Sequence, residues 1–289
     1  MAASLARNIF PESPLSEHFW IIIAGTAGLS MIFVKSLSQV AWLSLLSVIA
    51  LFVAVIVVLG YGFAHYSAWV PRGILVWDLD SVPVSLAVII FSYVCHPVLP
   101  GVEASMKKRS QFRRMLALVY LSVAMLKLVF AVCAYFSFSS NIHDVIVNSL
   151  PMGIMRLVVN SFFLLNVLFS YPFVVITIVQ TFEGSVSAES FPFKIPDLVW
   201  FVVIRVVTNF LTLLPAIAIP HFTLFMAFIG SLTGSLICFI FPGVFHLALK
   251  SKELKMYECT LDVAVIVFGI VASILGLLYT GKELFGKVA

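Results

Sequence analysis

Charged residues are scarce in this chain: Asp, Glu, Lys and Arg together make up 10% of its 289 residues. An average soluble domain has about a quarter. Hydrophobic residues reach 62%, and the mean hydropathy of the whole chain is +1.14. This composition excludes a cytosolic enzyme, a nucleic-acid-binding protein and a disordered regulator, and it indicates an integral membrane protein.

The sequence also lacks the motifs by which enzymes and metal proteins are identified. It has no H-E-x-x-H motif, no glycine-rich phosphate loop, no G-x-S-x-G motif and no carboxylate cluster. Its four cysteines (Cys95, Cys133, Cys238 and Cys259) have no metal-ligand spacing, and we expect them to act as small buried hydrophobes. We therefore expect no enzyme activity, no metal and no cofactor. A cleavable signal peptide is not expected either, because residues 1–19 contain no apolar core.

Long hydrophobic runs dominate what is present. A helix needs about 20 apolar residues to cross the hydrocarbon core of a bilayer. Eight runs approach or exceed this length, and they predict an all-α integral membrane fold of about eight transmembrane helices. These runs are Phe19–Val34, Ala41–Ala64, Val82–Leu99, Met115–Phe138, Ile154–Phe182, Leu198–Ile219, Phe222–Leu249 and Leu261–Tyr279.

The connections on alternate sides of these spans differ in their content of Lys and Arg. One side holds ten basic residues, five of them within 107–114, whereas the other side holds four. Cytoplasmic loops are enriched in Lys and Arg, so the richer side is predicted to be cytoplasmic. Both termini are then luminal. The basic segment 107–114 is interpreted as a topology signal, with lipid head-group binding as the alternative.

The third run contains two prolines and a glycine within five residues: Pro97, Pro100 and Gly101. Proline removes a backbone donor and clashes with the preceding turn, so we expect a broken helix here. Within a membrane such a break is tolerated where protein buries it or where it lines a wet cavity. Broken helices hold the substrate in many secondary transporters, through their freed N–H and C=O groups.

Two ionisable residues flank this predicted break. His96 titrates near neutrality, and Glu103 is a carboxylate close to a membrane segment, so both are candidate proton carriers. Each also has a structural interpretation. His96 could be a satisfied buried histidine, and Glu103 could end the helix at the interface and pair with Lys107 at i+4.

Other polar residues lie inside the predicted spans, where they are costly. Lys127 and Arg205 are too deep to reach water, and we expect them to face the bundle in an ion pair or an anion contact. Asn160 and Ser170 lie near one face of the fifth run, which either bonds neighbouring helices or lines a cavity. Gly230 and Gly234 form a small-xxx-small pair that predicts close helix packing.

Several segments in order along the chain resemble the amino acid/auxin permease family of proton-coupled transporters. They are IIFSYVCHPVLPGVEASM (Ile89–Met106), MLKLVFAVCAYFSF (Met125–Phe138), SLPMGIMRLVVN (Ser149–Asn160), LFSYPF (Leu168–Phe173), PHFTLFMAFIGSLTGSLICFIFPGVFHL (Pro220–Leu247) and LDVAVIVFGIVAS (Leu261–Ser273). Each segment alone is weak evidence, but their combination and order are specific. The likeness is strongest to the branch that loads inhibitory amino acids such as GABA and glycine into vesicles.

The resemblance implies eleven helices in an inverted repeat of five plus five, with the first and sixth helices broken around the substrate. The eight runs of this chain would match helices four to eleven of that pattern, as a partial copy that lacks the first three. The family pattern places Phe91, Ser92 and Tyr93 in the unwound sixth helix, where they would bind substrate. We add Asn160 and Ser170 as substrate candidates.

The resulting expectation is a proton-coupled carrier of small neutral amino acids in a vesicle membrane, using a proton gradient and no cofactor. Its partners are the amino acid substrate and the lipid bilayer, without nucleic acid. A transport-incompetent protein that binds or regulates a full-length relative is the alternative. The expected organisation is a non-cytoplasmic segment over residues 1–18, a partial transporter domain over 19–282 and a luminal tail over 283–289.

Overall fold

The computed structural model describes residues 2–10, 12–32, 37–66, 81–138, 142–143, 145–185, 196–218, 222–250 and 254–288. Within these ranges the chain is helical and contains no strand. Seven helical segments are long and apolar enough to cross a membrane. The predicted all-α integral membrane fold is therefore confirmed. The described chain divides into two compact units, which are treated separately below.

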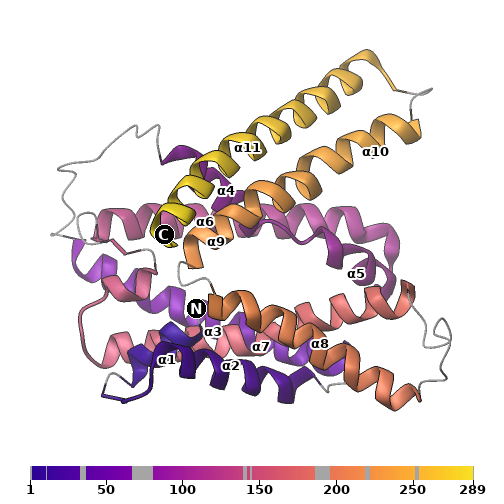
Figure 1. Cartoon of the computed structure of the whole chain (residues 1–289). Helices are drawn as coiled ribbons and strands as arrows, with labels where there is room; N and C mark the ends of the chain where they lie inside the picture. Colours follow the sequence, from indigo (N-terminus) through magenta and orange to yellow (C-terminus); the bar gives the residue numbers. More distant parts are fainter. Residues whose placement is uncertain are drawn as a thin grey trace. The chain divides into compact units, whose positions relative to one another are not determined.

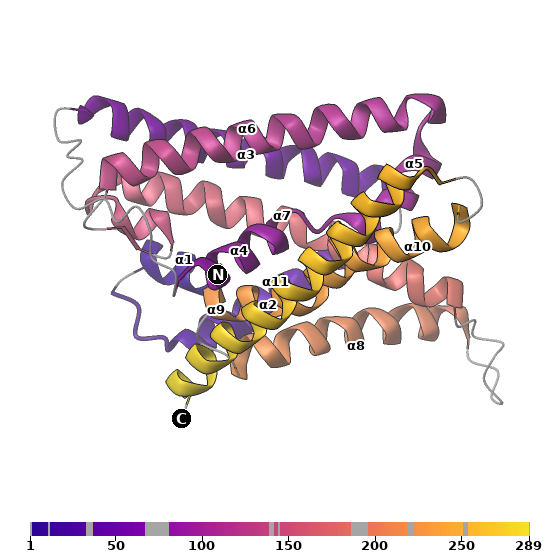
Figure 2. The same cartoon turned by 90° about the horizontal axis from the view of Figure 1, so that it is seen from above.

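The first unit contains α1 (Ala2–Ile9), α2 (Glu17–Ile32), α3 (Leu37–Ala64), α6 (Phe112–Phe138), α7 (Ile154–Ser185) and α8 (Asp197–Ala218), together with the short η5 (Ile146–Ser149). Helices α3 and α6 run side by side, and α3 also packs along α7 (Figures 1 and 2). These long helices exist because their apolar side chains satisfy a bilayer while every backbone group bonds within the helix.

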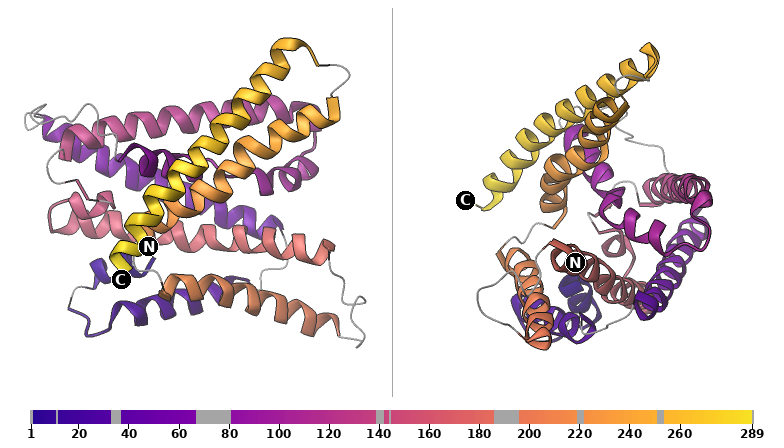
Figure 3. Two further views of the ribbon diagram at one scale, coloured as in Figure 1. Left: turned by 45° about the horizontal axis from the view of Figure 1, so that its top comes forward. Right: turned by 90° about the vertical axis from the view of Figure 1, so that its right-hand side faces the viewer.

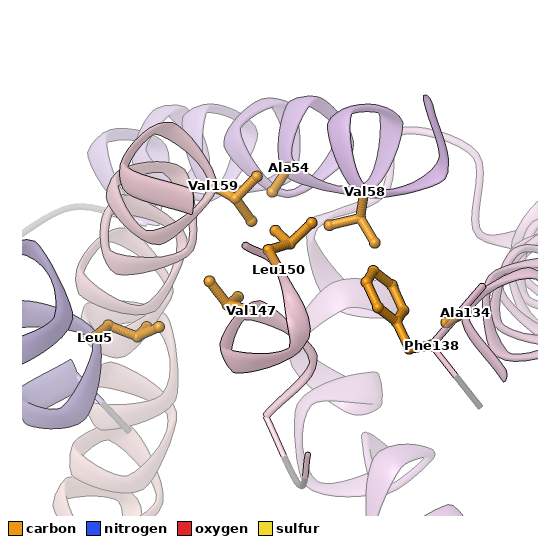
Figure 4. Packing of buried hydrophobic residues seen from close by; sticks show 8 residues of the cluster. All are labelled: Leu5, Ala54, Val58, Ala134, Phe138, Val147, Leu150 and Val159. Atoms are coloured by element: carbon orange, nitrogen blue, oxygen red, sulfur yellow. The ribbon is translucent and has the colours of Figure 1, made fainter. Parts of the chain in front are cut away.

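The core of the first unit lies where α1, α3, α6, η5 and α7 meet. Its most deeply buried members, each no more than 2% exposed, are Leu5, Ala54, Val58, Val147, Leu150 and Val159. Ala134 and Phe138 complete the cluster (Figure 4). The N-terminal helix α1 therefore belongs to the folded unit, since its Leu5 is buried in this cluster.

The second unit contains one interrupted helix, one helix with π-helical turns and one continuous α-helix. The interrupted helix consists of α4 (Val82–Ser92), η2 (His96–Val98) and α5 (Leu99–Ser105). The helix with π-helical turns consists of α9 (Phe222–Ile229), the turns η7 (Gly230–Gly234) and η8 (Leu236–Ile240), and α10 (Phe241–Lys250). The continuous helix is α11 (Met256–Val288), which lies beside α10 (Figures 1 and 3).

Several predicted boundaries differ from those observed. The first predicted span corresponds to α2, whose 16 residues fall short of the length that a span needs, so the count of eight stays a prediction. α11 begins before the run Leu261–Tyr279 and continues to Val288, into the residues expected as a tail. Residues 219–221, which connect the sixth and seventh predicted spans, lie outside the described residues.

Candidate functional site

The predicted broken helix is present in the second unit. α4 ends at Ser92, and the N–H groups of Tyr93 and Val94 bond back three residues, to the carbonyls of Ile90 and Phe91 at 3.1 Å. Tyr93, Val94 and Cys95 lie outside regular helix before η2 and α5 resume the chain direction. The interruption therefore comes between α4 and η2.

The prolines lie just after the break, at the positions where helices tolerate them. Pro97 is in the first two residues of η2, and Pro100 is in the first two residues of α5. The N–H that proline lacks would have no helical partner there in any case. Gly101 lies inside α5, and a Cβ added to it would meet no atom within 4 Å. The break is thus real, but it is shifted toward the N-terminus from the prolines that predict it.

The π-helical turn η7 packs against the end of α4 through its glycines. A Cβ at Gly230 would collide with the carbonyl oxygen of Ala87 and lie 2.8 Å from the Cβ of Phe91. A Cβ at Gly234 would lie 2.9 Å from the Cγ2 of Ile90. The close packing predicted from the small-xxx-small pair is therefore confirmed, and it brings η7 against the residues just before the break.

The next turn, η8, contacts the break itself. The Sγ of Cys238 lies 3.7 Å from the Nδ1 of His96, the first residue of η2. Cys95, the residue before His96, is half-buried. Both His96 and Cys238 are half-buried. The imidazole of His96, on the broken helix, therefore contacts the π-helical segment.

The helix α11 also packs against η7 and η8. A Cβ at Gly276 would overlap the Ser231 side chain, and a Cβ at Gly269 would lie 2.8 Å from the Cβ of Phe239. Ser231 donates to the Ala227 carbonyl at 2.7 Å. The hydroxyl of Ser235 is buried without a hydrogen-bond partner in the described part of the chain. π-helical turns and buried hydroxyls of this kind are frequent at functional sites.

Three predicted substrate residues adjoin the break. Phe91 and Tyr93 are half-buried, and Ser92 donates its hydroxyl to the Ile89 carbonyl at 2.7 Å. The structure brings these residues together with His96 on one interrupted helix. Whether they bind substrate stays a prediction.

Glu103 lies farther along, on the exposed last turn of α5. That helix ends at Ser105, and Met106 has extended backbone angles (φ −74°, ψ 134°). Lys107 is therefore beyond the helix, and the i+4 geometry considered for a Glu103–Lys107 pair does not exist. Glu103 therefore lies on the same interrupted helix as the break, three residues after Pro100.

The other two substrate candidates belong to the first unit. Asn160 is fully buried in α7, and its Nδ2 donates to the Arg156 carbonyl at 2.9 Å. Its Oδ1 has no hydrogen-bond partner among the described residues. Ser170 donates to the Val167 carbonyl at 3.2 Å, and its position ten residues on places it about 15 Å along the helix from Asn160. A single small ligand would not span both side chains.

Arg205 is buried in α8, at 5% exposure. It donates to the Phe201 carbonyl at 3.2 Å, and its guanidinium carbon lies 3.5 Å from the centre of the Phe201 ring. The expectation that it faces the bundle is confirmed, and these contacts are a carbonyl and an aromatic face. Lys127 is half-buried in α6.

Two polar groupings were missed at the level of sequence. In the first unit, Asn209 donates to the hydroxyl of Tyr171 at 2.9 Å, and that hydroxyl lies 2.9 Å from Thr212. In the second unit, His246 lies 2.6 Å from Asp262. The Asn209–Thr212 spacing at i+3, which places two polar side chains on one face of α8, could have indicated the first. The second joins two helices, and no local pattern marks it.

Among the described residues no group of three or more His, Cys, Asp and Glu side chains is placed to hold a metal ion. The chemistry that remains at the break is that of backbone dipoles, hydroxyls, thiols and one imidazole. Such groups suit the binding of a small zwitterion and the transfer of a proton.

Comparison with protein families identifies the chain. The family model described as transmembrane amino acid transporter protein matches residues 1–280. The chain belongs to this family. Membership in a family of membrane transporters agrees with the expectation that the chain is not an enzyme.

Individual members of the transmembrane amino acid transporter family show the same likeness. The vesicular inhibitory amino acid transporter of Rattus norvegicus is 33% identical over 289 residues, which cover 97% of this chain and 55% of the relative. The vesicular GABA transporter of Caenorhabditis elegans is 28% identical over 297 residues, covering 100% and 61%. The amino acid transporter AVT3C of Arabidopsis thaliana is 24% identical over 200 residues, covering 69% and 44%. The chain therefore spans little more than half the length of its vesicular relatives.

Proposed function

We propose that this chain takes part in moving small neutral amino acids, such as GABA and glycine, across a vesicle membrane. Membership in the transmembrane amino acid transporter family supports this function. The substrate class follows from the relatives, which are named as carriers of inhibitory amino acids and of GABA. The energy source would be a proton gradient, without a cofactor.

The observation that carries this proposal is the interrupted helix α4–η2–α5. At its break the regular hydrogen-bond pattern is lost, so backbone dipoles there can face a carboxylate and an ammonium group. The substrate residues that we propose, Phe91, Ser92 and Tyr93, come directly at the end of α4. The aromatic rings would limit the size of the amino acid, and the hydroxyls would bond its charged ends.

His96 is the proton carrier that this geometry favours. Its imidazole is half-buried and lies at the break, in contact with Cys238 of the facing helix. Since histidine changes charge near neutral pH, a proton on His96 would alter the field felt by a bound zwitterion. Glu103 is the second candidate, at the exposed end of the same interrupted helix.

The orientation that we propose places both termini in the lumen. The difference in Lys and Arg content between the two sides supports it. The direction of transport depends on the gradient: protons that leave an acidic lumen would drive amino acids in the opposite direction, from the cytoplasm into the vesicle.

Reconstitution of the chain in liposomes with an acidic interior tests the proposal. Labelled glycine and GABA should accumulate inside, and a protonophore should abolish the accumulation. His96→Gln should remove the gradient-driven part. If the wild-type chain shows neither uptake nor exchange of either amino acid, the transport proposal is wrong.

As a second function we propose that the chain binds a full-length relative in the membrane and regulates it; likeness to the rat transporter over 97% of this chain supports association between the two. Co-expression of the two with different tags, followed by purification in mild detergent, tests this. Recovery of the chain alone, without the relative, would contradict regulation by binding.

A further inference from the structure

A hydrogen bond between a histidine and an aspartate joins α10 and α11 in the second unit. The Nδ1 of His246 lies 2.6 Å from the Oδ2 of Asp262, which is a short hydrogen bond. Both residues belong to helical segments that are apolar enough to span a membrane. Ionisable residues in such segments are rare and are commonly part of proton or substrate pathways.

The two helices are in close contact at this point. Gly243, one turn before His246, has no side chain, and an added Cβ would lie 2.7 Å from Ile266 and 3.3 Å from the Asp262 carbonyl oxygen. The two side chains are therefore fixed by helices that approach closely. The two side chains are nevertheless partly accessible, because His246 is 41% exposed and Asp262 is 19% exposed.

The contact determines which imidazole nitrogen is available. An ionised carboxylate only accepts hydrogen bonds, so Nδ1 of a neutral His246 must carry the proton that Asp262 accepts. The other nitrogen, Nε2, is then unprotonated and can take up a proton. The same carboxylate–imidazole arrangement orients the base in hydrolytic triads.

Among the residues that the structure describes, few other charged groups lie near this pair. Besides α10, the elements packed against α11 are α4, α9, η7 and η8; these four contain no charged residue, and their one titratable side chain is Cys238. On α10 the neighbouring charge is Lys250, one turn after His246. On α11 the neighbouring charge is Glu258, one turn before Asp262. The Glu258 carboxylate accepts hydrogen bonds from the Lys255 N–H and the Tyr257 hydroxyl.

We propose that His246 and Asp262 form a proton-binding site at the end of the α10–α11 pair, with Nε2 of His246 as the acceptor. The site is separate from the helix break: Cys238, which contacts the break, is eight residues before His246, or about 12 Å along the helix. Asp262 compensates the charge of the protonated imidazole. The coupling of this proton to amino acid movement rests on the proposed function, whereas the site itself does not.

The first experiment determines the tautomer of His246 without any transport measurement. The full chain is labelled with ¹⁵N-histidine in detergent micelles, and His246→Gln assigns the signal among the six histidines. Above neutral pH, wild-type His246 should carry its proton on Nδ1, and acidification should protonate Nε2. In Asp262→Ala the neutral ring should shift toward the Nε2–H form. A wild-type His246 that is Nε2-protonated at high pH, or that never binds a second proton, would overturn the proposal.

The second experiment separates proton coupling from substrate binding. Gradient-driven uptake of labelled glycine should fall about tenfold or more in His246→Gln and in Asp262→Asn, the effect of losing a charge-assisted hydrogen bond. Exchange of labelled for unlabelled glycine needs no net proton movement and should stay near the wild-type rate. Loss of uptake and exchange together would contradict a proton-coupling role.

His65→Gln is the matched control for both experiments. The Nδ1 of His65 lies 3.0 Å from the backbone carbonyl of Tyr61, and the residue is exposed at the end of α3. This control should retain uptake, because the imidazole that it removes contacts no carboxylate within the described part of the chain. If the wild-type chain shows neither uptake nor exchange, the proposed function fails, and the tautomer measurement alone decides whether the proton site exists.

Discussion

Substituting Gly230 tests the contact between the π-helical segment and the broken helix. An alanine Cβ there would collide with the Ala87 carbonyl oxygen and lie 2.8 Å from the Cβ of Phe91. A backbone carbonyl in helix α4 cannot rotate away, so the two helices would have to separate. Overpacking of this kind costs about 1–3 kcal/mol of stability. Gly230→Ala should therefore be clearly destabilised.

Two further glycines make the test a graded series. At Gly234 the nearest atoms are the side-chain methyls of Ile90, at 2.9 Å, and of Val94, at 3.4 Å, which can move by rotation about their bonds. At Gly60, inside α3, an added Cβ would meet nothing within 4 Å. Each glycine-to-alanine change also gains up to about 1 kcal/mol of helix propensity. All three variants share this gain in helix propensity, so the differences in their stability report the steric cost of the added Cβ.

The assay is thermal unfolding in one detergent, followed by the fluorescence of the five tryptophans. A change of 1 kcal/mol shifts Tm by about 2–4 °C in domains of 150–250 residues. We expect the order Gly60→Ala, Gly234→Ala, Gly230→Ala from highest to lowest Tm. A Gly230→Ala protein as stable as Gly60→Ala would refute the close packing of η7 on α4.

Three other changes test separate parts of the chain. Asn166→Ala removes bonds from α7 to the backbone and hydroxyl oxygens of Ser47, at 2.9 and 3.0 Å, and should cost about 1 kcal/mol in thermal unfolding; an unchanged Tm would contradict this. His96→Gln should reduce gradient-driven uptake more than Glu103→Gln, because His96 lies at the break and Glu103 on an exposed turn; equal losses would contradict this. Cys259 is exposed and the other cysteines are half-buried, so an impermeant maleimide should label it first, from the predicted cytoplasmic side; labelling only from the lumen would reverse the orientation.

The helical segments could be predicted from the sequence because a bilayer imposes a long apolar run on each span. The starts at Val82, Ile154 and Phe222 and the end at Phe138 agree with the structure. The extent of α11 could not be predicted in the same way. Hydropathy marks the residues that meet hydrocarbon, whereas backbone hydrogen bonding continues into the polar interface.

The broken helix was predictable, but its position was not. Pro97 and Pro100 indicate that a regular helix cannot continue, yet each lies in the first turn of a new helical piece. Proline is tolerated at such positions, so the irregular residues come before it, at Tyr93, Val94 and Cys95. The pattern identifies the interruption and leaves open which side of the prolines unwinds.

The contacts between helices were the least predictable part of the site. His246 and Asp262 lie 16 residues apart in the sequence, on two different helices. Their meeting depends on how α10 and α11 are aligned. The Cys238–His96 contact, across 142 residues, is equally invisible to a local pattern. In the first unit, Asn209 and Tyr171 meet 38 residues apart for the same reason.

The two π-helical turns, η7 and η8, also fix the rotational phase of everything that follows them. Each π turn accommodates an extra residue relative to an α-helix, and one residue corresponds to about 100° of rotation. The face on which His246 lies is therefore determined upstream, between Gly230 and Ile240. Removal of a single residue from that segment would keep the helix apolar and spanning, but would turn His246 away from Asp262. The number of residues between Gly230 and Ile240 therefore determines whether His246 faces Asp262, whereas their composition does not.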